Sequence, residues 1–420
     1  MAQPCGRTGV FAICHGVEQR TALAAALAGI ALLAATAALP TVKFFDDANV
    51  GDTPLYHTYG ENMRHGRLPY RDFFEEYPPG ALPAFVLPAV LPGASFTLWS
   101  KALQWLLAAC CIVFAAVTLR TARWRAALIG LTPALLGQVT FTRFDFWPAA
   151  LTAAALAAIV ARRHRIALAL LAVAVAAKEY PLALLPLFIL VVDRRAGRRE
   201  AKVAAAIFAA VLAAIVLPFA ALGPGGVRYS LEVQFRRPLQ VESLGASLLF
   251  ALHRLGAYTP HIVSTYGSQN LSGGTASAVG VLTTAIELAA IVAVWAAFAR
   301  GPRDDSTLFA AAAASVLAFL ALGKVLSPQY VVWIVALVPL ALRSWRLVLL
   351  GLAVGLTQVW SQGRYHEVTA GRSIVWAVLA RDLVLVVLYV LAAATLARRA
   401  RAPSTASPAA QSVNSSGSPA

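Results

Sequence analysis

The sequence predicts an all-α protein whose chain crosses a membrane about 12 times. Composition gives the first reason: 59% of the 420 residues are hydrophobic and only 13% are charged, where soluble domains carry about a quarter of charged residues. The mean hydropathy is +0.70. The second reason is pattern, because the apolar residues form runs comparable to a bilayer-crossing helix, separated by polar segments.

The apolar runs give the places of the predicted helices. They lie near 22–40, 96–119, 126–142, 147–161, 166–177, 181–192, 203–222, 276–299, 307–323, 329–342, 346–360 and 374–396. Several are shorter than the roughly 20 residues of a crossing helix, so the two runs beside Lys178 have a re-entrant pair as an alternative. The first run is longer than a signal-peptide core and lacks a cleavage site, so we expect a retained membrane anchor.

Basic residues predict the orientation. With a cytoplasmic N-terminus, the inward segments hold 20 of the 35 Lys and Arg residues but only 5 of the 19 acids, which is the positive-inside pattern. Both termini are then cytoplasmic: a tail of residues 1–21 and a Ser/Pro/Ala-rich tail of residues 398–420, expected to be disordered, flank a membrane domain of residues 22–397. Topology therefore explains the net charge of +16, and no nucleic acid is expected.

The outward segments mix charges of both signs with aromatic residues. They are residues 41–95, 143–146, 178–180, 223–275, 324–328 and 361–373. Opposite charges gathered at one face of a membrane suit a polar substrate that bears a phosphate. We expect such a site in the two long segments, 41–95 and 223–275.

The first outward segment is rich in acids: Asp46, Asp47, Asp52, Glu61, Asp72, Glu75 and Glu76. A carboxylate at the membrane interface can accept the proton of a sugar hydroxyl, although such acids also simply solvate a loop. Several prolines follow between residues 78 and 92 and disfavour a straight helix. They predict a kinked segment that places Glu76 and Tyr77 at the bilayer boundary.

Three basic groups could meet a phosphate. Lys178 interrupts an apolar stretch, where a cation is usually paired, either with a substrate anion or internally with Glu179 or a tyrosine. Lys324 stands at the outward end of a predicted span. The segment 223–275 carries the third group, whose arginine forks suit phosphate oxygens or lipid headgroups; its members are Arg228, Arg236 and Arg237, next to Glu242.

Other polar residues allow a structural interpretation. Arg143 and Asp145 form a short outward turn that is either an ion pair or part of a site. Arg381, Asp382 and Glu287 lie within predicted spans and favour an interior network that holds helices together. The seven histidines lack metal-ligand spacing, the four cysteines predict no disulfide, and nucleotide-binding motifs are missing. We therefore expect no metal or other cofactor, and a lipid-linked rather than a nucleotide-linked donor for any sugar.

A family resemblance follows from five motifs. They are Asp52-xxx-Tyr56, Gly66-x-Leu-Pro-Tyr-Arg-Asp72, Glu76-Tyr-Pro-Pro-Gly80, Lys178-x-Tyr-Pro181 and Lys324-Val-Leu-Ser-Pro-Gln-Tyr330. In this order the chain resembles the GT-C glycosyltransferases over roughly residues 40–330. It is most similar to glycosyltransferase family 87, the polyprenyl-phosphate-mannose-dependent mannosyltransferases of envelope glycolipids.

The resemblance implies an inverting sugar transfer at the outer face of the plasma membrane, from a polyprenyl monophosphate donor to a glycolipid or polysaccharide. It implies an essential aspartate ahead of a tyrosine in the first outer loop; Asp52 fits, with Asp47 and the adjacent Asp46 as alternatives. Membrane lipids are further partners. The substrate-binding residues expected on this basis are Tyr56, Arg71, Asp72, Glu76, Tyr77, Lys178, Tyr180, Arg236, Arg237, Glu242, Lys324 and Gln329.

Two other functions compete with this hypothesis. A transporter or lipid flippase would show matched halves and charges at the membrane midplane, whereas here the charges gather in outward loops and no internal repeat is visible. A non-catalytic envelope-assembly protein would tolerate loss of the loop acids.

Overall fold

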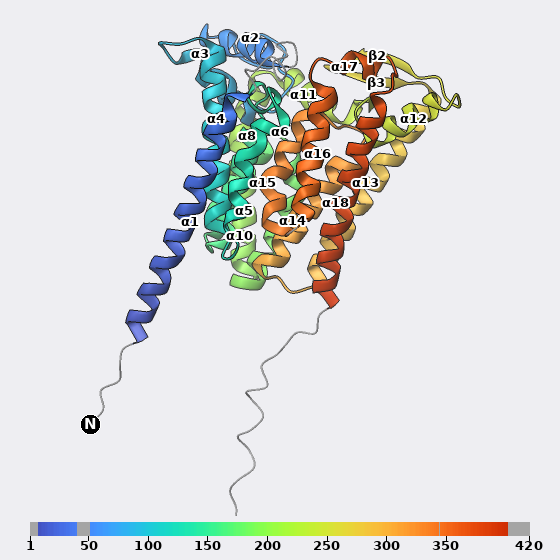
Figure 1. The fold of residues 1–420 in the computed structure, drawn as a ribbon. Coiled ribbons are helices and arrows are strands. Elements are labelled where there is room, and N and C mark those ends of the chain that lie inside the picture. The colour runs from blue at the N-terminus through green and yellow to red at the C-terminus, as the bar shows by residue number, and fades with distance from the viewer. Residues whose placement is uncertain (1–6, 40–50, 344, 402–420) are drawn as a thin grey trace, which may run out of the picture.

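The computed structural model describes residues 7–39, 51–343 and 345–401, and shows an all-α polytopic membrane protein with a small sheet at one end (Figure 1). Six helices of the described chain are long and apolar enough to cross a membrane. They lie in α1 (Arg7–Ala37), α4 (Phe96–Thr118), η4 (Tyr180–Leu184) with α10 (Leu185–Leu222), α13 (Gly274–Arg300), α14 (Asp305–Leu322) and α18 (Val375–Arg401).

Six further apolar helical segments have 10–17 residues. They are η2 (Pro79–Ala81) with α3 (Leu82–Val90); α5 (Trp124–Ala127) with η3 (Leu128–Leu131) and α6 (Thr132–Leu136); α8 (Phe146–Val160); α9 (His164–Ala177); η5 (Pro328–Tyr330) with α15 (Val331–Ala341); and α16 (Arg346–Ser361). With the exception of Pro79–Val90, where the sequence predicted a kinked segment, the long and short segments occupy the places of the predicted spans. How many of them cross the bilayer stays a prediction.

Two regions differ from the expected helices. The run 126–142 is not one helix but α5, η3, α6 and then α7 (Val139–Thr142), because Pro133 and Gly137, with φ of +64°, interrupt regular helix geometry. Conversely, the runs 181–192 and 203–222 join in α10, where Gly197 at φ +81° makes the kink between them.

Ion pairs gather the predicted inward segments at one end of the bundle. Arg165 contacts Glu200 at 2.9 Å, and Asp305 pairs with both Arg195 and Arg120. The start of α1 and the end of α18 lie at this end as well, away from the sheet (Figure 1). α9 starts at this end and ends before Lys178 at the other end; the alternative of a re-entrant pair beside Lys178 stays a prediction.

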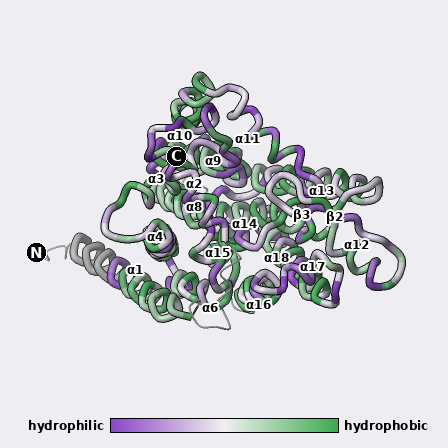
Figure 2. The backbone as a smooth tube through the Cα atoms, turned by 90° about the horizontal axis from the view of Figure 1, so that it is seen from above, coloured by the Kyte–Doolittle hydropathy of each residue, from purple (hydrophilic) through white to green (hydrophobic). Residues whose placement is uncertain are grey.

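The centre of the bundle is formed by α14 and α15, which are buried along almost their whole length. Seen from above, they lie between α8, α16 and α18, while α1 lies at the rim beside α4 and α6 (Figure 2). Alanine-rich α14 lets neighbouring helices approach closely. η5 leads directly into α15, so the buried centre reaches the sheet end of the bundle.

The sheet end contains α2 (Thr53–Arg64), α11 (Pro224–Arg236), α12 (Leu244–Arg254), α17 (Tyr365–Thr369) and three strands (Figure 1). The antiparallel strands β1 (Leu239–Gln240), β3 (Ser268–Ser272) and β2 (His261–Thr265) lie in that order. Tyr266 and Gly267 join β2 to β3 with positive φ angles of 53° and 67°, the two-residue turn that suits a hairpin. This sheet was not predicted.

Candidate active site

A cavity of about 350 Å³ opens at the sheet end. All six segments predicted to face outward contribute to its wall, although they are spread from Asp52 to Tyr365. The charged residues of the wall are the carboxylates Asp52, Glu76, Glu179 and Glu242 and the cations Arg143, Lys178 and Arg237. Residues far apart in the sequence thus form one highly charged site.

Most of the remaining wall is neutral and polar. The hairpin supplies Ser264, Gly267, Ser268 and Gln269. Gln234 comes from α11, Gln240 from β1, Gln329 and Tyr330 from η5, and Ser327 from the position before η5. Some of these side chains position one another, since Gln240 Nε2 donates to Ser327 Oγ at 2.9 Å. Amide and hydroxyl groups of this kind suit the hydroxyls of a sugar.

Lys178 is the most enclosed cation of the cavity. It ends α9 in an extended conformation ahead of Pro181, and its Nζ donates to Asp145 Oδ1 at 2.8 Å. Trp333 Nε1 donates to the same oxygen at 2.8 Å. The rings that surround Nζ at 4.8–5.7 Å add cation–π attraction; they are Tyr77, Phe144, Tyr330 and Trp333. The internal partner of Lys178 is therefore Asp145, beside tyrosine faces.

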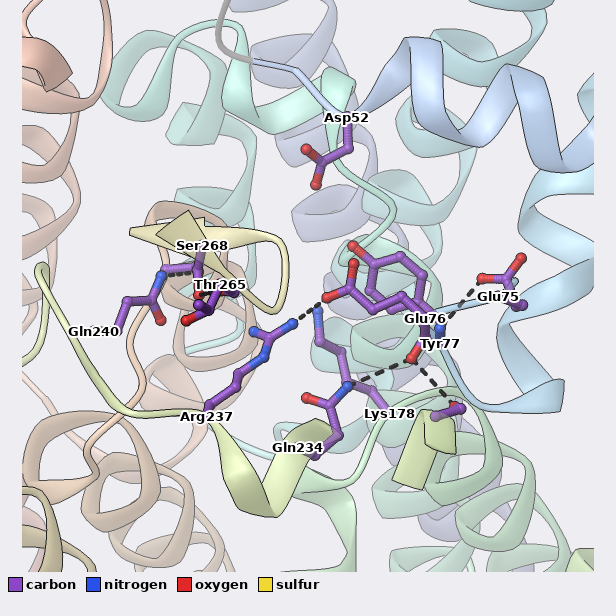
Figure 3. A network of polar contacts seen from close by, with 12 residues as sticks. Asp52, Glu75, Glu76, Tyr77, Lys178, Gln234, Arg237, Gln240, Thr265 and Ser268 are labelled. Carbon is purple, nitrogen blue, oxygen red and sulfur yellow. Dashed lines mark hydrogen bonds and ion pairs between the residues drawn. The ribbon is translucent and has the colours of Figure 1, made fainter. Parts of the chain in front are cut away.

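Glu76 and Arg237 form an ion pair in the cavity wall (Figure 3). The backbone carbonyl of Glu76 accepts hydrogen bonds from Ser230 Oγ and Gln234 Nε2, so α11 holds this stretch of the first loop. Burial raises the pKa of the Glu76 carboxyl, while Arg237 and Lys178 lower it. The pair gives the cavity a cation already oriented by a carboxylate.

Asp52 lies directly before α2, and its carboxylate points into the cavity (Figure 3). It pairs with Arg143, which stands in the connection between α7 and α8. Tyr56 also donates its hydroxyl to Asp52 Oδ2, at 3.3 Å. Burial lowers the pKa of Arg143, and nearby Asp145 and Glu242 oppose this shift. The two contacts fix the direction of the Asp52 carboxylate.

Two guanidinium groups of the cavity retain unused donors. The Nε atoms of Arg143 and Arg237 are buried and have no hydrogen-bond partner among the described residues. A bound anion could satisfy them, since planar guanidinium forks suit phosphate oxygens. Within the described chain, no three His, Cys, Asp or Glu side chains come together as a metal site would require.

The family follows from a comparison with known proteins. A model of glycosyltransferase family 87 matches residues 74–328, which is more than half of the chain. The chain belongs to glycosyltransferase family 87. It is therefore a membrane glycosyltransferase. No curated protein matches the chain.

The family match contains most of the charged cavity wall of this glycosyltransferase. Glu76, Lys178, Arg237 and Glu242 fall within it, together with β1, β2 and β3. Asp52 precedes the match, and Tyr365 follows it.

The cavity brings together seven of the residues expected from the sequence: Asp52, Glu76, Tyr77, Lys178, Arg237, Glu242 and Gln329. Two others lie immediately behind the wall. Tyr56 packs in an aromatic cluster against Phe85 and reaches Asp52 with its hydroxyl. Tyr180 is buried and stacks on Trp333, with ring centroids 4.2 Å apart.

The remaining expected residues lie elsewhere. Arg71 and Asp72 are bonded to each other in the first loop, away from the cavity. Arg236 lies near Glu232 on the exposed side of α11. Lys324 donates to the backbone carbonyl of Phe235 at 2.8 Å and so ties the end of α14 to α11. Asp46 and Asp47 lie outside the described residues.

Sequence reasoning gave no site role to the hairpin, Gln234, Gln240 or Tyr365, and left the role of Arg143 open. Arg143 had a signal, because it stands next to a predicted span beside an acid. The other residues are neutral and sit in long polar segments, where residue type alone does not distinguish a cavity wall from solvent-facing surface. The pairing of β3 with β1 and β2 places the hairpin and Gln240 at the cavity, whereas Gln234 reaches it from α11 and Tyr365 from α17.

Proposed function

We propose that this glycosyltransferase moves a sugar, with mannose first to be tested, from a polyprenyl monophosphate donor to an envelope glycolipid or polysaccharide. The observation that carries the proposal is the single cavity in which Asp52 stands among the cations Arg143, Lys178 and Arg237. A base for an acceptor hydroxyl and positive groups for a leaving phosphate are the two requirements of the reaction. No nucleotide motif suggests another donor.

The proposed step is a direct displacement. The acceptor oxygen forms a bond to the anomeric carbon while the bond from that carbon to the phosphate oxygen breaks. Asp52 accepts the hydroxyl proton, and the departing polyprenyl phosphate keeps the bonding electron pair. Lys178 and Arg237 stabilise the negative charge that develops on it. Attack from the side opposite the leaving group inverts the anomeric configuration, as in the GT-C type of enzyme.

An apolar cavity of about 520 Å³ supports a lipid-linked donor. It lies between the first loop and the helices α8, α9 and α10, and is lined by Met63, Leu68, Leu82, Val86, Trp147, Val173, Ala214, Ile215 and Phe219, among others. Only a few residues separate it from the charged cavity: Glu76 and Tyr77 face the charged cavity, while Pro79 and Gly80 line the apolar one. We assign the apolar cavity to the isoprenoid chain of the donor.

The proposed location is the outer face of the bacterial plasma membrane. Arginine-rich segments meet at the end of the bundle that also carries the described chain ends, and such segments normally stay in the cytoplasm. The charged cavity lies at the opposite end. It would therefore face the compartment in which envelope glycolipids are extended.

The test uses membranes from cells that express the protein and from cells that do not. Both are incubated with radiolabelled polyprenyl-phosphate mannose, polyprenyl-phosphate glucose or GDP-mannose, and the lipid and polysaccharide fractions are analysed for new label. We expect expression-dependent labelling from a polyprenyl-phosphate sugar, unchanged by an excess of unlabelled GDP-mannose. Labelling only from the nucleotide sugar, or no labelling from any donor, contradicts the proposal.

A further inference from the structure

Two opposite charges lie side by side in the last membrane helix. Arg381 and Asp382 of α18 are both fully buried, and Arg381 Nε lies 2.7 Å from Asp382 Oδ1. A buried ion pair is weak evidence for stability, because desolvation of both charges can exceed their attraction. Charges within a membrane helix usually serve a function. The sequence predicted a network that holds membrane helices together.

The pair also contacts the wall of the charged cavity. Arg381 Nη2 donates to the backbone carbonyl of Glu242 at 2.7 Å. Asp382 Oδ2 accepts a hydrogen bond from Ser247 Oγ at 2.7 Å. Both contacts reach the segment 242–247, where Ser243 caps the start of α12. The guanidinium of Arg381 also lies over the ring of Trp360, 5.0 Å from its centroid, and so forms a cation–π contact.

Through this segment the pair reaches the proposed reaction site. Tyr365 and the charges of Arg381 and Arg143 act on the Glu242 carboxyl, and each lowers its pKa. Arg143 is in turn the partner of Asp52. Interactions therefore lead from Arg381, near the start of α18, through Glu242 and the charge of Arg143 to the carboxylate proposed as the base.

We propose that Arg381 is a positioning residue that fixes the place of Glu242 in the cavity, and that Asp382 orients Arg381 for this role. Neither residue needs to touch a substrate. Both lie beyond residue 328, where the family match ends, so the C-terminal part of the chain completes a wall that begins within the matched region. The inference uses the proposed sugar transfer only as one of its two readouts.

The first readout is the pH profile of transfer. Burial raises the pKa of Glu242 to about 7. The groups that face it from the packed elements are Arg381 of α18, Tyr365 of α17 and Arg143 between α7 and α8. Arg381 opposes this rise in the pKa. Arg381→Gln should therefore move the part of the pH profile of kcat/KM that follows the titration of Glu242 to higher pH, by about one unit. Arg381→Lys, which keeps the charge, should shift it less.

A double-mutant cycle separates positioning from general damage. Glu242→Gln should remove this part of the pH profile, and adding Arg381→Gln to Glu242→Gln should produce no further shift. Arg399→Gln is the matched control, because Arg399 lies in the same helix near Asp304, away from the cavity. Arg381→Gln shifting the profile in the Glu242→Gln background, or not shifting the wild-type profile at all, overturns the proposal.

The second readout does not depend on catalysis. Hydrogen–deuterium exchange should be faster in peptides that cover residues 239–254 when Arg381 is replaced by Gln or Lys, and unchanged in Arg399→Gln. If Arg381→Gln does not accumulate as a folded protein, Ser247→Ala gives the test, with a smaller increase over the same peptides. Uniform faster exchange over the whole chain, or none in this segment, would assign the pair a general structural role. If the protein does not catalyse the proposed transfer, the hydrogen–deuterium exchange result still tests the positioning role of Arg381.

Discussion

At the scale of residues, the Asp52 carboxylate has two partners. Arg143 pairs with its carboxylate and Tyr56 donates a hydroxyl to it. A neighbouring guanidinium favours the ionised form of a carboxylate, which a general base requires, but also weakens its attraction for a proton. In the proposed reaction, Asp52 accepts the proton of the acceptor hydroxyl while Lys178 and Arg237 stabilise the leaving phosphate.

The first prediction concerns this base. Asp52→Asn should lower the rate of transfer by about 10²–10⁴-fold, the usual contribution of general base catalysis, with little change in donor binding. Glu61→Gln is the matched control, because Glu61 lies on α2, is bonded to Arg64 and is absent from the cavity wall. The rates are measured with labelled polyprenyl-phosphate sugar. An active Asp52→Asn enzyme with an inactive Asp47→Asn enzyme would move the role to Asp47.

At the scale of elements, the hairpin of β2 and β3 sets one wall of the cavity. Its turn residue Gly267 has φ of +67°, and a Cβ atom there would lie 3.1 Å from Glu76 Oε2. A side chain at this position therefore strains the turn and crowds the Glu76–Arg237 pair. The hairpin tip requires glycine for both reasons.

The second prediction separates these two effects. Gly267→Ala should lower transfer several-fold, because the added methyl displaces the Glu76 carboxylate. Gly256→Ala carries the same backbone strain, at φ of +78°, but its Cβ would meet no atom within 4 Å. Each substitution should destabilise the fold by about 1 kcal/mol, measured by thermal unfolding in detergent. Equal activity losses in the two variants would show that strain alone matters.

The apolar cavity gives the third prediction. Ala214→Trp should fill part of it and raise the KM for a long polyprenyl donor about tenfold or more, while a water-soluble short-chain donor is affected much less. The control is Leu217→Trp, since Leu217 lies on the same helix but is 61% exposed and does not line the cavity. Equal effects on both donors would remove the isoprenoid chain from this cavity.

At the scale of the whole molecule, the bundle was largely predictable and the cavity only partly. A chain that crosses lipid must satisfy its backbone within helices and expose apolar side chains, so the runs that became α4, α13 and α18 were visible as hydropathy. The short polar strand β3 gives no such signal. Likewise, nothing in the order of residues reveals that Lys178 pairs with Asp145, because that choice depends on how α8 and α9 pack.

The fourth prediction tests orientation. In a variant without the four native cysteines, Arg228→Cys and Arg120→Cys place single thiols at sites whose arginine side chains are 77% and 72% exposed. A membrane-impermeant maleimide added to intact cells should label the first and not the second. Permeabilised cells should allow both to react. The reverse pattern in intact cells would put the charged cavity in the cytoplasm and exclude the proposed location.

The late position of Tyr365, Arg381 and Asp382 has a consequence for biosynthesis. A nascent chain would already hold Asp52, Lys178 and Arg237 in the membrane, yet the proposed reaction site would lack one side until α18 is inserted. Catalysis would then begin only after α18 joins the bundle. Chains without α18 would be unable to use the lipid-linked donor proposed above.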